Sequence, residues 1–313
     1  FVGERTFNVG ASIGAVVFAE EGLAERDVMR HVDLSLYHAK RLGRGMIQFY
    51  HPSLQTAAIN RLRLEEGLRR AIANNELELY FQPQVDTAGQ MIGAEVLLRW
   101  HHPELGNIPP STFIPVAEET GLIHRIGRWV LEQACIRLTH WLRIDIPFRG
   151  RLSVNVCAAQ FACPDFVEQV RHVLTAYQID PRYLTLELTE TALLHDVSEA
   201  IEKLTALRIL GLEVALDDFG TGYSSLAYLK NLPLDLIKID KMFIKELETT
   251  PEHSLVESIV TIGKLMKLGV VAEGVETAMQ HDILITLGCS KFQGYFFSRP
   301  LPEPDFLEWM ATD

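Results

Sequence analysis

Eight short apolar segments recur along the chain after residue 76, and this recurrence limits the possible folds more than any other feature. Most are continuous apolar runs rather than strict alternations, which is typical of strands covered by helices on their outer face. Helical stretches lie between most of them, and eight strand–helix units need about 250 residues to close a barrel. We therefore predict an α/β fold with a (β/α)8 TIM-like barrel. Its predicted strands are Leu77–Val85, Met91–Trp100, Arg151–Cys157, Leu184–Thr189, Leu212–Asp217, Leu234–Ile239, Val270–Glu273 and Lys291–Phe297.

The connection between the first two predicted strands is too short to contain a helix. Only residues 86–90 intervene, so we expect a hairpin in which the first strand is antiparallel to the rest. The alternative architecture, an open doubly wound sheet, usually has a Gly-rich phosphate loop after its first strand. Neither a GxGxxG nor a GxxxxGK motif occurs in the sequence, and this favours the barrel.

Capping signals mark two predicted helices near the end of the chain. Ser254 and Glu257 have the spacing of a capping box, and apolar residues then follow at helical spacing. We expect Gly269 to end this helix. Thr277 and Gln280 repeat the capping signal for the next helix.

The first fifty residues have a different pattern, which predicts strand, helix and strand. Residues 8–18 form an apolar run, residues 26–40 carry a helical apolar stripe, and residues 46–50 form a short strand. A polar segment at residues 51–60 separates this pattern from that of the barrel. We predict two domains, a short α/β unit with its linker at 1–54 and the barrel at 55–313.

Composition narrows the class of partner and the cellular compartment. The formal net charge of −12 argues against a nucleic-acid polymer, because phosphate neutralisation supplies most of that affinity. No apolar run approaches the ~18 residues of a membrane span, and no signal peptide is visible. The four cysteines form no CxxC pair, which indicates free thiols in a reducing cytoplasm. Because the chain starts without methionine, we interpret it as a fragment without membrane contact of its own, whose upstream part could carry a sensor or membrane anchor.

Polar residues stand inside or just after the predicted strands. In a barrel these strand ends converge on one face, where active sites are assembled. Each residue alone is compatible with a surface position or a helix cap, but their recurrence from strand to strand predicts one shared site. The residues are Glu95, Asn155, Glu187, Asp217, Asp218, Lys238, Glu273 and Gln293.

Five of these residues are carboxylates, which would repel one another in a single cavity unless cations compensated them. Oxygen ligands without histidine or cysteine favour Mg²⁺, Mn²⁺ or Ca²⁺ over zinc. The adjacent pair Asp217–Asp218 suits two ions about 3.5–4 Å apart, and a helix N-cap is the alternative for this pair. Lys238 could polarise a water beside the carboxylates, or face solvent at an edge. Arg99 could bind a phosphate oxygen, or form an ordinary salt bridge.

Seven motifs, in order, resemble those of the EAL family. Glu95-Val-Leu-Leu-Arg-Trp100 looks like the signature that names the family, with Val96 in place of the usual alanine. The likeness covers roughly residues 61–310. The other motifs are Ser153-Val-Asn155, Glu187-Leu-Thr-Glu190, the segment from Asp217 to Leu226, Ile237-Lys-Ile-Asp240, Ala272-Glu-Gly-Val-Glu276 and Phe292-Gln-Gly-Tyr-Phe296.

This resemblance implies a phosphodiesterase that hydrolyses cyclic di-GMP to linear 5′-pGpG, with two Mg²⁺ or Mn²⁺ ions as cofactors and Ca²⁺ as an inhibitor. It also implies roles for the matched residues. The metal ligands would be Glu95, Asn155, Glu187, Asp217, Asp218 and Glu273. The catalytic residues would be Glu95, Asp218, Glu273 and Lys238, the last holding the nucleophilic water. Gln82, Leu97, Arg99 and Gln293 would contact substrate, and Glu190 would anchor the loop at 218–226, which in this family links the active site to dimerisation.

Residues 1–50 resemble the end of a GGDEF, or diguanylate cyclase, domain. The likeness rests on Ala11-Ser-Ile-Gly14 and on Asp33 to Lys40 followed by Gly43-Arg-Gly45. The cyclase signature itself is not in this chain, so we expect no cyclase activity from it. We expect the remnant either to be partly disordered or to pack against the barrel.

Two other functions compete with the enzyme. The first is a catalytically silent cyclic di-GMP receptor; such relatives usually lack a metal ligand or the loop motif, and this chain lacks neither. The second is an unrelated metal-dependent barrel such as an aldolase, which would need a Schiff-base lysine or an enolate pocket. The sequence has no independent sign of either. A homodimer through the barrel is expected by family analogy.

Overall fold

A computed structural model describes residues 10–18, 24–43, 45–143, 148–194, 196–220, 229–248 and 255–312 of the chain. The chain divides into two compact units, residues 1–70 and residues 71–313. The first unit contains β1 (Ile13–Ala15), α1 (Glu25–Arg41), β2 (Ile47–Phe49) and α2 (Pro52–Ala71).

In the first unit, β1 and β2 pair in parallel, with α1 between them in sequence. This is the small α/β sheet that the sequence pattern predicts, although both strands are shorter than expected. Gly14 lets α1 approach the sheet, because a side chain there would collide with the backbone of Leu36. The helix α2 runs through residues 51–60 and across the predicted boundary at residue 54. That boundary and the cyclase remnant stay predictions.

The second unit is a closed barrel of eight strands, as the sequence predicts. Seven of the eight strands run parallel to one another. The first strand, β3, pairs antiparallel with both β4 and β11 and so closes the ring. Short strands β5 (Gly106–Ile108) and β12 (Leu301–Pro302) extend the sheet at its edges. The barrel strands are β3 (Leu77–Asp86), β4 (Met91–His102), β6 (Arg151–Val156), β7 (Leu184–Thr189), β8 (Glu213–Phe219), β9 (Leu236–Ile239), β10 (Gly269–Ala272) and β11 (Lys291–Phe292).

The predicted hairpin between the first two barrel strands is confirmed. Its tight turn is held by Asp86, whose side chain accepts hydrogen bonds from the backbone N–H groups of Ala88 (2.8 Å) and Gln90 (3.0 Å). Gly89 adopts a φ of 82°, in the left-handed region that glycine tolerates best. The register shifts between Gln84 and Val85, and beyond this irregularity Gln82 stands opposite Glu95.

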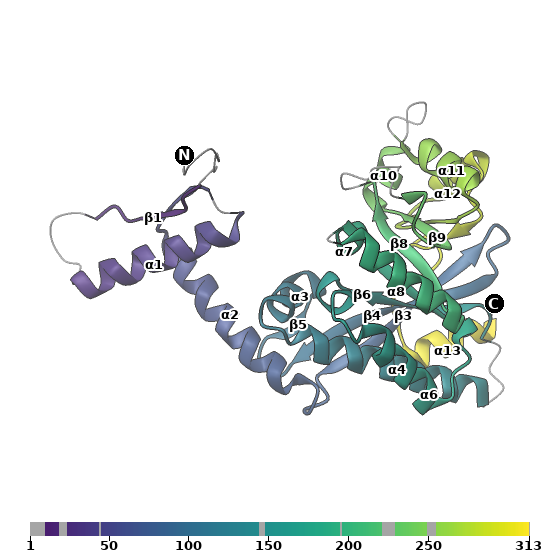
Figure 1. Ribbon diagram of the computed structural model, residues 1–313, viewed down its shortest axis with the longest axis horizontal. Coiled ribbons are helices and arrows are strands. Elements are labelled where there is room, and N and C mark those ends of the chain that lie inside the picture. The colour runs from purple at the N-terminus through teal and green to yellow at the C-terminus, as the bar shows by residue number, and fades with distance from the viewer. Residues whose placement is uncertain are drawn as a thin grey trace. The chain divides into compact units, whose positions relative to one another are not determined.

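Helices cover the outside of the barrel, and α4, α6 and α8 lie side by side over one part of its wall (Figure 1). The capping box predicted at Thr277 and Gln280 opens α12, and Gly288 ends that helix with a φ of 94°. The helices of this unit are α3 (Pro110–Glu119), α4 (Ile123–Arg143), α5 (Ala158–Phe161), α6 (Phe166–Tyr177), α7 (Glu190–Leu194), α8 (Val197–Leu210), α10 (Lys241–Glu246), α11 (Leu255–Met266), α12 (Ala278–Leu287) and α13 (Glu303–Thr312), with a 3-10 turn at Pro181–Tyr183.

Two expected element ends differ from the structure. The helix α11 ends at Met266, because Lys267 already adopts a left-handed φ of 58° and Leu268 N–H bonds back to Gly263. Gly269 instead begins β10, and the predicted cap Ser254 lies outside the described residues. The last strand stops at Phe292 rather than at residue 297, because Gly294 accepts turn hydrogen bonds from the two residues that follow Phe296.

Aromatic side chains fill the space between the barrel and its covering helices. Trp141 of α4 is fully buried and packs against Phe81, Phe148 and Phe306 at ring-centroid distances of 5.0–5.5 Å. Its indole N–H donates to Glu303 at 2.8 Å, so the polar end of this large ring is satisfied. This packing joins β3 to both α4 and α13.

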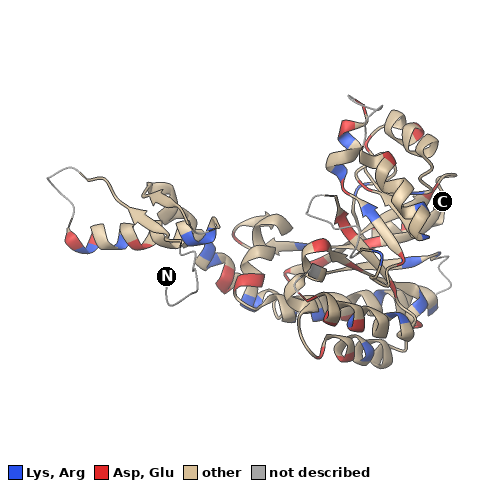
Figure 2. Cartoon of the chain, turned by 45° about the horizontal axis from the view of Figure 1, so that its top comes forward, with Lys and Arg blue, Asp and Glu red and all other residues tan. Residues whose placement is uncertain are grey.

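Acidic and basic residues are interspersed over the helices that cover the barrel (Figure 2). In the described part of the chain, no helix is long and apolar enough to cross a bilayer. The acidic residues that are predicted to gather at one end of the barrel belong to its strands or directly follow them, and do not belong to these helices.

The four cysteines are free thiols and should differ sharply in reactivity. Burial raises the pKa of Cys135 and of Cys289 to about 12, whereas Cys163 is only half-buried and its sulfur lies 3.4 Å from Nδ1 of His124. We expect a thiol reagent at pH 8 to modify Cys163 first, and to reach Cys135 and Cys289 only after unfolding, because the thiolate is the reactive form. Peptide mapping of the labelled native protein, with Cys163→Ser as control, checks this order.

Candidate active site

A single buried lysine organises the inside of the barrel. Lys238 on β9 is 1 % exposed. Its ammonium lies 2.5 Å from Glu187, 2.5 Å from Glu273, 3.2 Å from Asp217 and 3.8 Å from Glu95. These carboxylates are presented by β7, by the end of β10, by β8 and by β4. Strands up to about 180 residues apart in sequence thus converge on one charge, as the strand ends of a barrel do.

The strand register explains this convergence. Asn155 on β6 stands opposite Glu187 on β7, and Lys238 on β9 stands opposite Val271 on β10. Side chains at alternate positions of a strand share a face, so Glu95, Asn155 and Glu187 all point to the interior side of the wall. The predicted site residues from three neighbouring strands, β4, β6 and β7, are therefore brought together.

The adjacent aspartates would face opposite sides of a regular strand, and a β-bulge resolves this conflict. In β8, Asp217 and Asp218 together oppose the single residue Lys238 of β9. Asp218 adopts a left-handed φ of 53°. As a result Asp217 contacts Lys238, while the Asp218 carboxyl lies in hydrogen-bond contact with Asp240. The bulge turns two consecutive carboxylates toward one region.

The cluster is buried and contains more acidic groups than basic ones, and both conditions raise the pKa values of three of its carboxyl groups. Burial and the neighbouring carboxylates raise the pKa of Glu187 to about 8 although Lys238 opposes the shift, and the same causes raise the pKa of Glu273 well above its usual range. Burial and Asp217 raise the pKa of Asp218 to about 6. Burial alone would lower the pKa of Lys238, but the surrounding carboxylates raise it well above the ordinary value. One lysine does not compensate this many acids.

Amide groups complete the side of the site next to Glu95. Asn155 Nδ2 donates to one Glu95 oxygen at 2.6 Å, and Gln293 Nε2 donates to the other at 2.5 Å. Gln293 Nε2 also donates to Gln82, at 3.0 Å. A further buried glutamine, Gln84, donates to Gln293 Oε1 at 2.9 Å. The predicted residues Gln82 and Gln293 thus lie directly beside the predicted ligand Glu95.

Two predicted substrate residues lie farther along β4, toward its end. Leu97 is half-buried. The guanidinium of Arg99 lies over the Tyr80 ring, 5.2 Å from its centroid, and donates to the Leu98 carbonyl at 3.0 Å. Burial lowers the pKa of Arg99, whereas Glu95 of the carboxylate cluster acts on the guanidinium electrostatically and favours its charged form. The predicted role of Arg99 with phosphate stays a prediction.

The structure describes the residue that is predicted to anchor the loop and only the first residues of the loop itself. Glu190, at the start of α7, is buried, and neither of its carboxylate oxygens has a hydrogen-bond partner within the described ranges. The loop it is predicted to anchor includes residues 221–228, which lie outside those ranges. Its anchoring role remains a prediction.

Sequence reasoning missed two residues of this site. Gln84 stands two positions after Gln82, and Asp240 two positions after Lys238. The period-2 alternation of a strand could have found both, because i and i+2 share a face. Asp240 also caps α10, accepting a hydrogen bond from Met242 N–H at 2.7 Å, and this local role is typical of an aspartate that follows a strand.

The donor set fits hard divalent cations. Carboxylate oxygens and the amide oxygen of Asn155 are the ligands that Mg²⁺ and Mn²⁺ prefer, and the raised pKa of Glu187 shows negative charge that such ions would neutralise. Among the described side chains, no three His, Cys, Asp or Glu converge at metal-binding distances, since the carboxylates close on Lys238 instead. The chemistry of the residues fits a metal centre.

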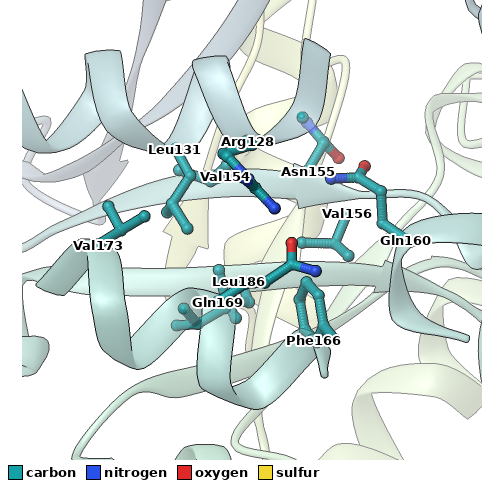
Figure 3. Close-up of a pocket in the computed structure, with 12 residues that line it drawn as sticks. Arg128, Leu131, Val154, Asn155, Val156, Gln160, Phe166, Gln169, Val173 and Leu186 are labelled. Atoms are coloured by element: carbon teal, nitrogen blue, oxygen red, sulfur yellow. The ribbon is translucent and has the colours of Figure 1, made fainter. Parts of the chain in front are cut away.

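A separate small cavity lies on the outer side of the barrel wall. Side chains of α4 and α6, among them Arg128 and Gln169, reach over Val154, Val156 and Leu186 of the strands (Figure 3). Its volume of about 20 Å³ suits roughly one water molecule. It is too small for a nucleotide, so the interior cluster is the better candidate site.

The chain is similar to known proteins over most of its length. The EAL domain family matches residues 65–300. The chain is 39% identical over 315 residues to the bifunctional diguanylate cyclase/cyclic di-GMP phosphodiesterase MucR of Pseudomonas aeruginosa, covering 99% of this chain and 45% of MucR. It is 39% identical over 300 residues to the cyclic di-GMP phosphodiesterase NbdA of the same organism, covering 95% of this chain and 38% of NbdA.

A solved structure, the PaMucR phosphodiesterase in complex with c-di-GMP, is similar with a TM-score of 0.75 and 42% identity. The alignment covers 78% of this chain and 99% of that one. The chain spans less than half the length of these two curated relatives, so it is compared with part of each protein.

Proposed function

Since the chain belongs to the EAL domain family, we propose that it hydrolyses cyclic di-GMP to linear 5′-pGpG. One observation carries this proposal: carboxylates from four separate strands surround the buried ammonium of Lys238. A structural salt bridge needs one partner, and burying several acids around one lysine is costly without a function for them. Perturbed acids inside a barrel are typical of active sites.

We propose that Glu95, Asn155, Glu187, Asp217, Asp218 and Glu273 hold two divalent cations. When bound, such ions supply Lewis acidity toward a phosphoryl oxygen and make a nearby water more acidic. Asn155 suits this role because its Nδ2 is used by Glu95, which leaves its amide oxygen available. Asp240 is a further acid beside Asp218 that this proposal adds to the site.

The chain's own groups orient the reactants. The Lys238 ammonium carries protons that can hydrogen-bond to an attacking water and hold it in line with phosphorus. Gln293 donates to the Glu95 carboxylate and to Gln82. Both glutamines therefore lie beside Glu95, where they would bind water or substrate. Arg99, stacked on Tyr80, would receive a phosphate or base at the outer part of β4.

Product analysis tests the proposal. The purified chain is incubated with cyclic di-GMP and Mg²⁺ or Mn²⁺, and we expect chromatography to show pGpG. The matched control is the same protein with EDTA. Tight binding of cyclic di-GMP without product in either metal would contradict the proposal and support the silent receptor instead.

Metal should stabilise the protein more at high pH than at low pH. The pKa of Glu187 is raised in the folded state to about 8, from an ordinary value of about 4.3. Between these values the folded state binds more protons than the unfolded state, so the free energy of unfolding of the metal-free protein falls as pH rises. Divalent ions need the ionised form, and we expect Mg²⁺ to raise Tm by about 5 °C at pH 8.5 and much less at pH 5.5.

Thermal unfolding with Mg²⁺ or EDTA at both pH values checks this prediction. Glu187→Gln is the control variant, because it removes the titrating group and should flatten the pH dependence of the metal-free protein. Equal Mg²⁺ shifts at pH 5.5 and pH 8.5 would contradict the prediction.

Two other parts of the interpretation stay proposals. We propose that residues 1–54 are the end of a cyclase-like domain, and that the barrel forms homodimers. Sedimentation at working concentration tests the second of these, and a monomer would count against it.

A further inference from the structure

Three buried glutamines form a continuous hydrogen-bonded relay that ends on Glu95. Gln82, Gln84 and Gln293 are each 9 % exposed or less, as is Glu95. Gln84 Nε2 donates to Gln293 Oε1 at 2.9 Å, and Gln293 Nε2 donates both to Gln82 Oε1 at 3.0 Å and to Glu95 Oε2. Gln82 Nε2 donates to the backbone carbonyl of Ser298 at 3.0 Å.

The direction of every bond in this relay is fixed by its two ends. The Ser298 carbonyl can only accept, so Gln82 must turn its NH2 group toward it and present its oxygen to Gln293. An ionised Glu95 also only accepts, so Gln293 must point its NH2 group there. The oxygen of Gln293 is then left facing Gln84, which must donate. The amide orientations therefore follow from chemistry and do not depend on telling N from O.

We propose that Gln84 is a positioning residue for the hydrolysis: it holds the Gln293 amide in the one orientation that donates to Glu95. This inference rests on the proposed function. Gln84 has no contact with the carboxylate cluster, and it acts through Gln293. It lies opposite Gly93, where a side chain would come within 3.3 Å of Gln84 Oε1. The nearest atom to such a side chain is the Arg151 carbonyl oxygen, at 2.5 Å, so glycine at residue 93 chiefly accommodates the neighbouring strand β6 and also leaves room for Gln84.

Two variants of similar size separate positioning from packing. Gln84→Glu keeps the shape, but once ionised it can only accept, and it would draw the NH2 group of Gln293 away from Glu95. While protonated it can still donate to Gln293. Gln84→Met also keeps the length, and it neither donates nor reverses the relay at any pH.

The measurement is the ratio of variant to wild-type kcat between pH 6 and pH 9. We expect the Gln84→Glu ratio to start near one and to fall about 100-fold as pH rises. KM should change less than about threefold, because the residue does not touch substrate. The Gln84→Met ratio should be reduced about tenfold and stay flat with pH. Dividing by the wild type cancels titrations that both proteins share.

The matched control is Gln90→Glu, which adds the same charge to the exposed end of the same hairpin and should keep a ratio near one. Flat ratios for Gln84→Glu and Gln84→Met alike would reduce Gln84 to packing and overturn the proposal. So would Gln84→Glu activity equal to wild type at pH 9.

A second readout separates this inference from the proposed function. If the wild type made no pGpG, the function would fail, but the relay could still be tested by NMR of the Gln293 side-chain amide. We expect its two N–H signals to shift with pH by clearly more in Gln84→Glu than in the wild type, where only the nearby titrating acids move them. Signals that shift alike in the two proteins would overturn the relay itself.

Discussion

Replacing Lys238 with alanine should slow turnover about 10³-fold while leaving the KM for cyclic di-GMP nearly unchanged. A group that holds and polarises the attacking water acts mainly in the transition state, so its loss appears in kcat. The variant should also unfold more easily without metal, by about 3–5 kcal/mol, because it leaves a cluster of buried acids without their cation. Added Mg²⁺ should recover part of this stability by taking over the compensation.

Steady-state kinetics and thermal unfolding of the same preparation check both effects. Lys245→Ala is the matched control, since Lys245 lies on the exposed side of α10 and should behave like the wild type. An unchanged kcat in the Lys238 variant would remove this residue from the mechanism. A loss of stability without loss of kcat would make it structural only.

The Glu95→Gln variant should lose turnover to about one thousandth of wild type, and Glu95→Ala or Asp217→Ala should abolish it. The glutamine keeps the shape of Glu95 but loses the negative charge that would bind metal. A bound metal ion contributes several kcal/mol of transition-state stabilisation. The glutamine also places an NH2 group against the donor of either Asn155 or Gln293, because these two bond to different Glu95 oxygens. The metal concentration that gives half-maximal activity should rise as well.

Turnover measured over a range of Mn²⁺ concentrations tests this prediction. Glu78→Gln is the control: it removes an exposed carboxylate of the same hairpin, whose pairing with His101 at 2.9 Å is worth little. Wild-type turnover in Glu95→Gln at every metal concentration would contradict the assignment of Glu95.

The fold could be predicted well because each barrel strand is a short apolar run with helical spacing after it. The antiparallel first strand followed from a connection of five residues, which no helix can fit. The failures lie where local backbone conformation decides. Lys267 ends α11 in a left-handed conformation that favours glycine or asparagine, so the sequence pointed to Gly269. Gly294 breaks the last strand because it packs against the backbone of Val275, a contact visible only in three dimensions.

The candidate site was predictable in its members and less so in its connections. Lys238 and its acids could be found because they are charged residues within or just after apolar strands. The β-bulge that turns Asp217 and Asp218 together could not be predicted. The identity of these two residues does not indicate which strand carries the extra residue. Gln84 was missed because a second glutamine beside a proline looks like an ordinary polar residue of a strand. Its role depends on two acceptors, the Gln293 side chain and the Ser298 carbonyl, which lie more than 200 residues away along the chain.

The antiparallel seam of the barrel has a consequence for synthesis. β3 is synthesised early, but β11, the strand that pairs with it to close the barrel, follows about 200 residues later. Until β11 has been synthesised, the sheet stays open. Pairing over such separations is slow. Gln293 follows β11 directly, so the support of Glu95 arrives only when the ring shuts. Under the proposed function, we therefore expect a polypeptide that ends before β11 to lack the support of Glu95 and to leave cyclic di-GMP intact.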